Sequence, residues 1–268
     1  MQETDSKWIA PDTLSKECVD GGYEDVFLEI GYKALIYLVD HLFKGVQNYF
    51  LEIFDTNWAM ESDTNPVGEI CNRFNEKFEI IDKLDKKSYE RLLNIVKHRT
   101  LVDYLTSMMR RRISLTTEDD RKRGESKIRE DEGILNEFFM AMSTHEAEIQ
   151  PENNFDVLGL IANVTGADEE MLTFELMTLI RQVVFTNLLT SSKFFCSKCR
   201  EINEEQIISI LFLRGVSRSD AKQIAMDILE NQERADDGGT DTSVGIFSEV
   251  KVSTGLINVK NIFMDKLQ

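Results

Sequence analysis

The chain has 268 residues, of which 42% are hydrophobic and 29% are charged, as is typical of a soluble globular protein with one or two domains. Its 48 acidic residues outnumber its 31 basic ones, and this formal net charge of −17 argues against a general nucleic-acid-binding protein, because such proteins bind by neutralising phosphates. No apolar run is long enough to cross a bilayer, the N-terminus does not resemble a secretory signal, and only three prolines interrupt the chain, which favours long helices.

Helical spacing begins after a polar start. Residues 1–25 are turn-rich and are predicted to form an irregular N-terminal segment. A first helical stripe, about six turns long, is then predicted from Leu35, Leu38, Val39, Leu42, Val46, Tyr49, Phe50, Ile53 and Phe54. A second helix is predicted to start at Pro66, with Asn65 as its N-cap, and to continue to about Leu84.

Further helices follow at regular intervals. A third is predicted over 88–112 and a fourth from Thr117, which has capping-box spacing with Asp120, to about Met142. Four more are predicted over 155–164, 169–189, 203–213 and 217–231, and the chain is expected to end in a short extended piece and a half-buried helix. The predicted fold is all-α, with antiparallel helices packed as consecutive helical bundles, the first over 26–150 and the second over 151–268.

A basic segment interrupts this acidic chain. Eight Arg and Lys residues lie between Arg110 and Arg129 with four acids among them, so the segment carries +4 and the rest of the chain −21. One interpretation is a contact patch for an acidic protein partner or an anionic lipid surface. That patch would consist of Arg110, Arg111, Arg112, Arg121, Lys122 and Arg123.

The other interpretation, which we favour, is structural. Residues 110–112 would close the third helix and residues 118–120 would open the fourth, where each sign of charge complements the helix dipole. Two i, i+4 pairs are also predicted on a solvated helix face: Arg121 with Glu125, and Lys127 with Asp131. Lipid contact stays open.

Motifs for metal binding or catalysis are weak. Cys196 and Cys199 have CxxC spacing, but a zinc site needs about four ligands and no second cysteine pair or nearby histidine follows. With only four cysteines in a chain of this length, a reducing cytosol is the expected environment. No Gly-rich phosphate loop, nucleophile elbow or HExxH motif is present, so the sequence predicts a protein that is not an enzyme, with no catalytic residue, metal or cofactor.

Ser114 ends the sequence "RRIS" and has arginines where an arginine-directed kinase would read them. Such short motifs are common by chance, so the pattern alone leaves phosphorylation open.

Three stretches in order along 84–263 resemble the C-terminal part of exocyst complex component 3, the Sec-six subunit: "VDYLTSMMRRRIS", "RKRGESKIREDEGILNEFF" and "LFLRGVSRSDAKQIAMDILE". That family shows an acid–Tyr start, a basic cluster ending in Ser, a charge-rich helix opening and a Leu-x-x-Arg-Gly element before its last helices. Two features depart from it. An apolar insert near 182–199 stands where the family has a short turn, and Val216 stands where it usually has an acid, so any cap made by that acid is in doubt.

The resemblance implies a rod-like array of helical bundles, in a chain that resembles a fragment of a much longer subunit. It implies a non-enzymatic role in the exocyst, which tethers secretory vesicles, through contacts with other exocyst subunits and SNARE proteins. It also implies a cytoplasmic protein recruited peripherally to the plasma membrane and secretory sites. Two alternatives stay open: a peripheral helical module that binds anionic lipid, and a paralogue acting in membrane protrusions. Nucleic acid is not an expected partner.

Overall fold

The computed structural model describes residues 23–55, 58–59, 65–81, 83–143, 155–189, 202–233 and 246–252. Every regular element within them is helical, so the predicted all-α class is confirmed. The chain separates into two compact units, Met1–Lys44 and Gly45–Gln268. The two bundles expected over 26–150 and 151–268 stay a prediction.

The first unit contains α1 (Tyr23–Lys44), and the second begins with α2 (Gln47–Glu52). The single helix predicted over 35–54 is therefore wrong, and α1 also starts earlier than the predicted stripe. Gly45 follows the last residue of α1, and glycine costs about 1 kcal/mol in a helix interior, so the stripe breaks there although its apolar spacing continues. Phe54, with φ of 60°, ends the stripe in a tight turn.

The remaining helices agree closely with those predicted. They are α3 (Pro66–Ile81), α4 (Lys86–Met108), α5 (Glu118–Met142), α6 (Asp156–Gly166), α7 (Glu169–Leu189), α8 (Glu204–Leu213) and α9 (Arg218–Glu233). The third helix ends at Met108 and not at Arg112, so residues 110–112 lie beyond it. Near the end, η3 (Ile246–Ser248) is a turn of 3-10 helix and residues 250–252 carry no regular element, while the final predicted helix lies outside the described residues.

Polar caps fix most of these helix starts. The Asn65 Oδ1 accepts from the Gly68 N–H at 3.0 Å, and the Thr117 Oγ1 accepts from the Asp120 N–H at 3.1 Å. Asn203 and Gln206 form a reciprocal capping box at the start of α8. These predicted caps are confirmed, and each satisfies N–H groups that a helix leaves without an internal partner.

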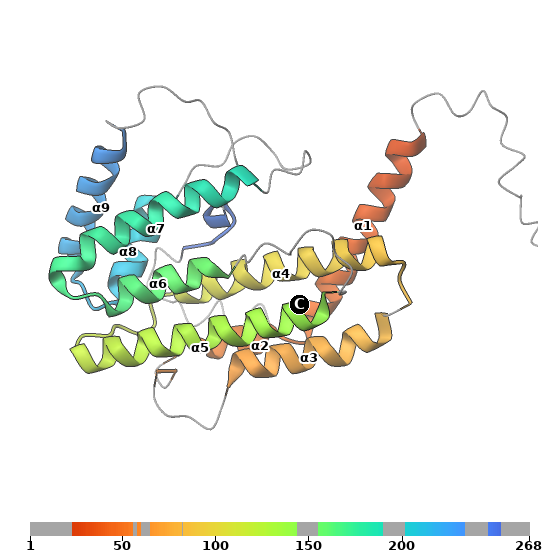
Figure 1. The fold of residues 1–268 in the computed structure, drawn as a ribbon, viewed down its shortest axis with the longest axis horizontal. Coiled ribbons are helices and arrows are strands. Elements are labelled where there is room, and N and C mark those ends of the chain that lie inside the picture. The colour runs from red at the N-terminus through yellow and green to blue at the C-terminus, as the bar shows by residue number, and fades with distance from the viewer. Residues whose placement is uncertain are drawn as a thin grey trace, which may run out of the picture. The chain divides into compact units, whose positions relative to one another are not determined.

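In the second unit, successive helices from α3 to α7 reverse direction along the chain (Figure 1). α5 packs along α6 and also contacts α3 and α4, while α8 contacts α4, α6 and α9. Apolar side chains from these helices form the shared core, among them Phe74, Leu92, Leu105, Ile128, Leu135, Leu158, Leu176, Ile207 and Leu211. The first three arginines of the basic segment, residues 110–112, thereby lie between α4 and α5, and the rest of its basic residues lie in α5.

One acidic residue lies inside this core. Asp131 was predicted on a solvated face, but it is 0% exposed. Its Oδ2 accepts from the Tyr104 hydroxyl at 3.0 Å, and its Oδ1 lies 3.5 Å from the Lys127 Nζ, so the predicted Lys127 pair is confirmed. Burial raises the pKa of Asp131 to about 6 against the opposing effect of Lys127. Burial, with the Asp131 charge, also raises the pKa of the Cys71 thiol to about 12.

Candidate interaction surface

The connection between α4 and α5, residues 109–117, carries the first three arginines of the basic segment. It lies against the C-terminal end of α8, where the Leu115 N–H donates to the Leu213 carbonyl at 2.7 Å. Leu115 is buried, and Arg111 has φ of 53°, a conformation that non-glycine residues rarely adopt. The connection is therefore an ordered, docked segment, which we call the arginine connection.

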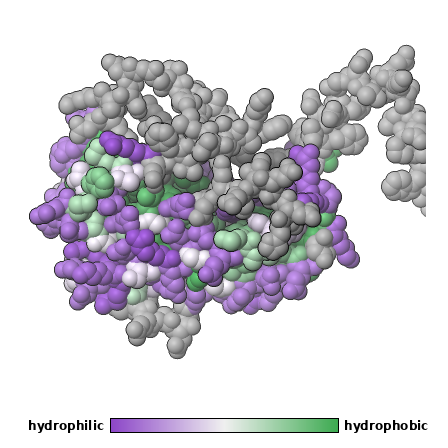
Figure 2. Space-filling model, viewed as in Figure 1, coloured by the Kyte–Doolittle hydropathy of each residue, from purple (hydrophilic) through white to green (hydrophobic). Residues whose placement is uncertain are grey.

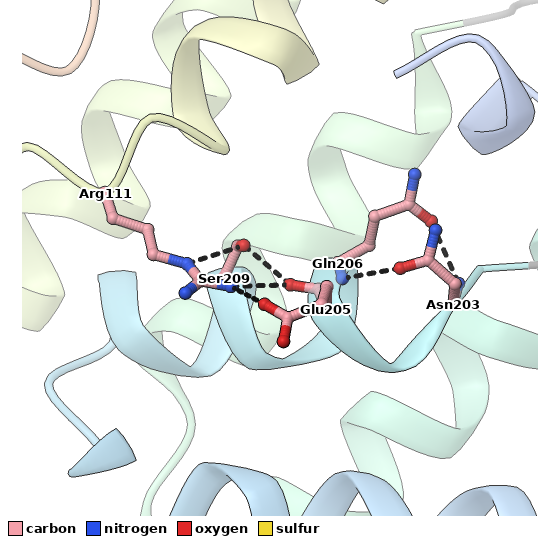
Figure 3. A network of polar contacts seen from close by, with 5 residues as sticks. All are labelled: Arg111, Asn203, Glu205, Gln206 and Ser209. Carbon is pink, nitrogen blue, oxygen red and sulfur yellow. Dashed lines mark hydrogen bonds and ion pairs between the residues drawn. The ribbon is translucent and has the colours of Figure 1, made fainter. Parts of the chain in front are cut away.

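Arg111 ties the arginine connection to α8. Figure 3 shows its guanidinium reaching the side chains of Glu205 and Ser209 on that helix. Its Nε donates to the Ser209 Oγ at 2.9 Å, and its Nη2 donates to the Glu205 Oε2 at 2.7 Å and carbonyl oxygen at 3.0 Å. The Arg111 side chain is only 13% exposed, so these are charge-assisted bonds with limited screening by water.

The two flanking arginines are also half-buried. The Arg112 Nη1 donates to the Leu51 carbonyl in α2 at 2.6 Å. Burial lowers the pKa of Arg110, helped by the Arg112 charge and opposed by Asp103. The side chains of Arg111 and Arg112 therefore bond to α8 and α2 and do not close the third helix, which the structural interpretation had expected of residues 110–112.

The other three patch residues lie on the first turns of α5. Lys122 and Arg123 are exposed and pair with Glu118 and Asp120 on the same helix. Arg121 does not make the predicted pair with Glu125. Its Nη1 donates to the Thr116 carbonyl at 3.2 Å, while the Glu125 Oε1 lies 3.0 Å from the Arg129 Nη2.

The Leu-x-x-Arg-Gly element supports the same junction from α8. The Arg214 Nη2 donates to the Ala167 carbonyl between α6 and α7 at 2.7 Å. Gly215 has φ of +94°, and a Cβ there would lie 2.5 Å from the Leu115 carbonyl oxygen. The Gly215 N–H donates to Phe212 and the Val216 N–H to Leu211, so backbone bonds cap this helix end without an acid at position 216.

An exposed apolar face on α7 was not predicted. Met171 is 44% exposed and Phe174 is 61% exposed, one helical turn apart. They lie beside Glu169 and Glu170 in the first turns of this helix. In the view of Figure 2, hydrophilic residues cover most of the surface and hydrophobic ones form separate patches. Apolar residues of α7 surround the helix and cannot all face one core, but their spacing does not say which of them stay exposed.

Other candidate chemistry lies outside this surface. Among the described residues, no group of three or more His, Cys, Asp and Glu side chains could hold a metal ion. No helix in the described part of the chain is both long and apolar enough to span a bilayer. Cys196 and Cys199, with His145, lie outside the described residues, as do the side chains of the apolar insert near 182–199.

Comparison with known proteins gives one family. A family model described as exocyst complex component Sec6 matches residues 20–187. A curated relative, the exocyst complex component 3-like protein of Danio rerio, is 22% identical over 200 residues, which cover 74% of this chain and 23% of that protein. The chain therefore spans about a quarter of the length of the relative that it matches. No solved structure matches. The family match ends before the Leu-x-x-Arg-Gly element and before much of the apolar insert.

Proposed function

The chain belongs to the exocyst complex component Sec6 family, and from this premise we propose that it works in exocytosis as a non-enzymatic protein-binding module. It would dock secretory vesicles through contacts with other exocyst subunits and with SNARE proteins. Such a role places it in the cytoplasm, recruited peripherally to the plasma membrane and secretory sites. A paralogue acting in membrane protrusions is the nearest alternative within the same family.

The observation that carries this proposal is the exposed apolar face of α7. Apolar side chains in the centre of a contact supply much of the binding energy of protein interfaces. Met171 and Phe174 offer such a centre, and the acidic residues beside them favour a partner with basic residues at its rim. Arg111 and Arg112 bind groups within the chain and are less available to an outside partner.

Direct binding tests the proposal. Purified exocyst subunits and plasma-membrane SNARE proteins would be titrated against the immobilised full chain. We expect at least one to bind, and Phe174→Glu to weaken that binding about tenfold or more, because it places a charge in a desolvated contact. Ile80→Glu is the matched control, since Ile80 is 77% exposed on α3 and the same charge is introduced there. Equal loss in both variants, or no binding to any subunit or SNARE, would contradict the proposal.

Lipid binding by the basic patch is the second candidate, and the exposed Lys122 and Arg123 are its strongest support. Flotation with vesicles that contain phosphatidylserine separates it from protein binding. A lipid module would bind strongly at low salt and lose this binding in Lys122→Glu with Arg123→Glu. We expect only weak flotation, because both side chains already pair with acids on α5.

A further inference from the structure

We propose that Ser114 is a phosphorylation site for arginine-directed kinases and that docking of the arginine connection on α8 controls access to it. Ser114 is exposed, whereas Ile113 before it is half-buried and Leu115 after it is buried. The Ser114 hydroxyl is therefore at the surface, while the neighbouring residues that a kinase would recognise are packed against the rest of the chain. This inference does not depend on the role in exocytosis.

The arginines before Ser114 are the recognition elements, and the chain itself binds them. Arg111, three residues before the serine, donates to Glu205 and Ser209. Arg112, two residues before it, donates to the Leu51 carbonyl. A kinase that binds arginines through its own acidic groups needs both side chains free and the backbone extended. Arg111, with φ of 53°, is not extended in the docked state.

Undocking is therefore required before phosphoryl transfer. Undocking breaks the hydrogen bond from the Leu115 N–H to the Leu213 carbonyl and separates Leu115 from Gly215. The Ser114 Oγ then forms a bond to the γ-phosphorus of ATP while the bond from that phosphorus to the bridging oxygen breaks. ADP leaves, and the hydroxyl proton passes to the carboxylate base of the kinase.

The phosphate would favour the undocked state in turn. A dianion close to Arg111 and Arg112 competes with Glu205 and with the Leu51 carbonyl for their guanidinium groups. The phosphate is added to the undocked segment and then favours the undocked state. Phosphorylation would therefore shift the equilibrium from docked to undocked and act as a switch. The net charge of residues 110–129 would also fall from +4 to about +2.

Kinase assays on the full chain test this proposal. The probe is the catalytic subunit of cyclic-AMP-dependent protein kinase with ATP, and phosphate on Ser114 is counted by mass spectrometry. A synthetic peptide of residues 107–119 gives the rate of the free segment. We expect the folded chain to react at least tenfold more slowly than the peptide, and Glu205→Gln to react several-fold faster than the unmodified chain.

Glu204→Gln is the matched control, because it removes the same charge from the adjacent residue of α8, which makes none of these bonds to Arg111. Circular dichroism would show that the variants are folded, and Ser114→Ala would identify the site. A folded chain that reacts as fast as the peptide would overturn control by docking. A peptide that is not phosphorylated on Ser114 would overturn the site itself, and equal rates in Glu205→Gln and Glu204→Gln would overturn the role of Arg111.

Discussion

At the scale of single residues, Asp131 and Gly215 show how the fold constrains which residue can stand at a position. Asp131 lies in the apolar stripe of α5, together with Ile128 and Leu135. Its carboxyl group faces Tyr104 from α4 and Lys127 from its own helix, with Trp58 lowering and Glu130 raising its pKa. A buried carboxylate with these partners is retained at a cost in stability, because burial disfavours its charged form.

The stability of the chain should therefore depend on Asp131 between about pH 4 and pH 6. The pKa of Asp131 in the folded chain, about 6, lies above its usual value, so the folded chain binds this proton more tightly than the unfolded chain does. The protonated carboxyl group therefore stabilises the fold fully at low pH, and this stabilisation is lost as pH rises through about 6. Compared with Asp131→Asn, the free energy of unfolding of the unmodified chain should fall by roughly 2–3 kcal/mol over this range. Urea unfolding of both proteins from pH 4.5 to 7.5 measures the difference, and a difference that stays flat over this range would contradict the pKa argument.

Gly215 supplies a second residue-scale prediction. Gly215→Ala should lower the free energy of unfolding by about 2 kcal/mol or more, because the backbone has positive φ and the new Cβ would meet the Leu115 carbonyl. Gly133→Ala in α5 is the matched control: nothing lies near its Cβ position, and alanine should stabilise that helix by up to about 1 kcal/mol. Chemical denaturation compares the two, and similar effects of the same sign would rule out the packing argument.

At the scale of elements, local sequence predicted most helix starts but not the contacts between helices. Asn65, Thr117 and Asn203 cap their helices as predicted, because a cap depends on residues only three positions apart. The bond from Arg111 to Glu205 joins residues 94 positions apart, and no local pattern contains that information. The burial of Asp131 did leave a signal, since it occupies an apolar position of its helix, but charge outweighed that position in the prediction.

The capping box of α8 offers an element-scale prediction. Gln206 also holds the segment after α9, since its Nε2 donates to the Phe247 carbonyl at 2.5 Å and to the Val250 carbonyl at 3.2 Å. Asn203→Ala should lower the free energy of unfolding by about 1 kcal/mol and loosen this segment. Hydrogen exchange should become faster across 246–252. Asn65→Ala removes an equivalent cap from α3 and should leave exchange there unchanged. Unchanged exchange in Asn203→Ala would show that the cap does not help Gln206 to hold this segment.

At the scale of the whole molecule, the second unit has a shared helical core, and hydrophilic residues predominate on the coloured part of the face seen in Figure 2. The net charge of −17 favours partners with basic contact surfaces and should make their association sensitive to salt. The sequence predicted an all-α protein because of its helical stripes, and its resemblance to the Sec-six subunit implied the same fold. It did not indicate the exposed face of α7, because helical spacing does not say which apolar residues stay at the surface.

Association with the exocyst in cells tests the proposed function most directly. The tagged full chain and its Phe174→Glu and Ile80→Glu variants would be purified from cells, and the proteins that accompany each would be quantified by mass spectrometry. We expect exocyst subunits to accompany the unmodified chain and Ile80→Glu, and to fall about tenfold or more in Phe174→Glu. Absence of exocyst subunits from all three purifications, together with strong binding of the purified chain to anionic vesicles, would contradict the proposed function.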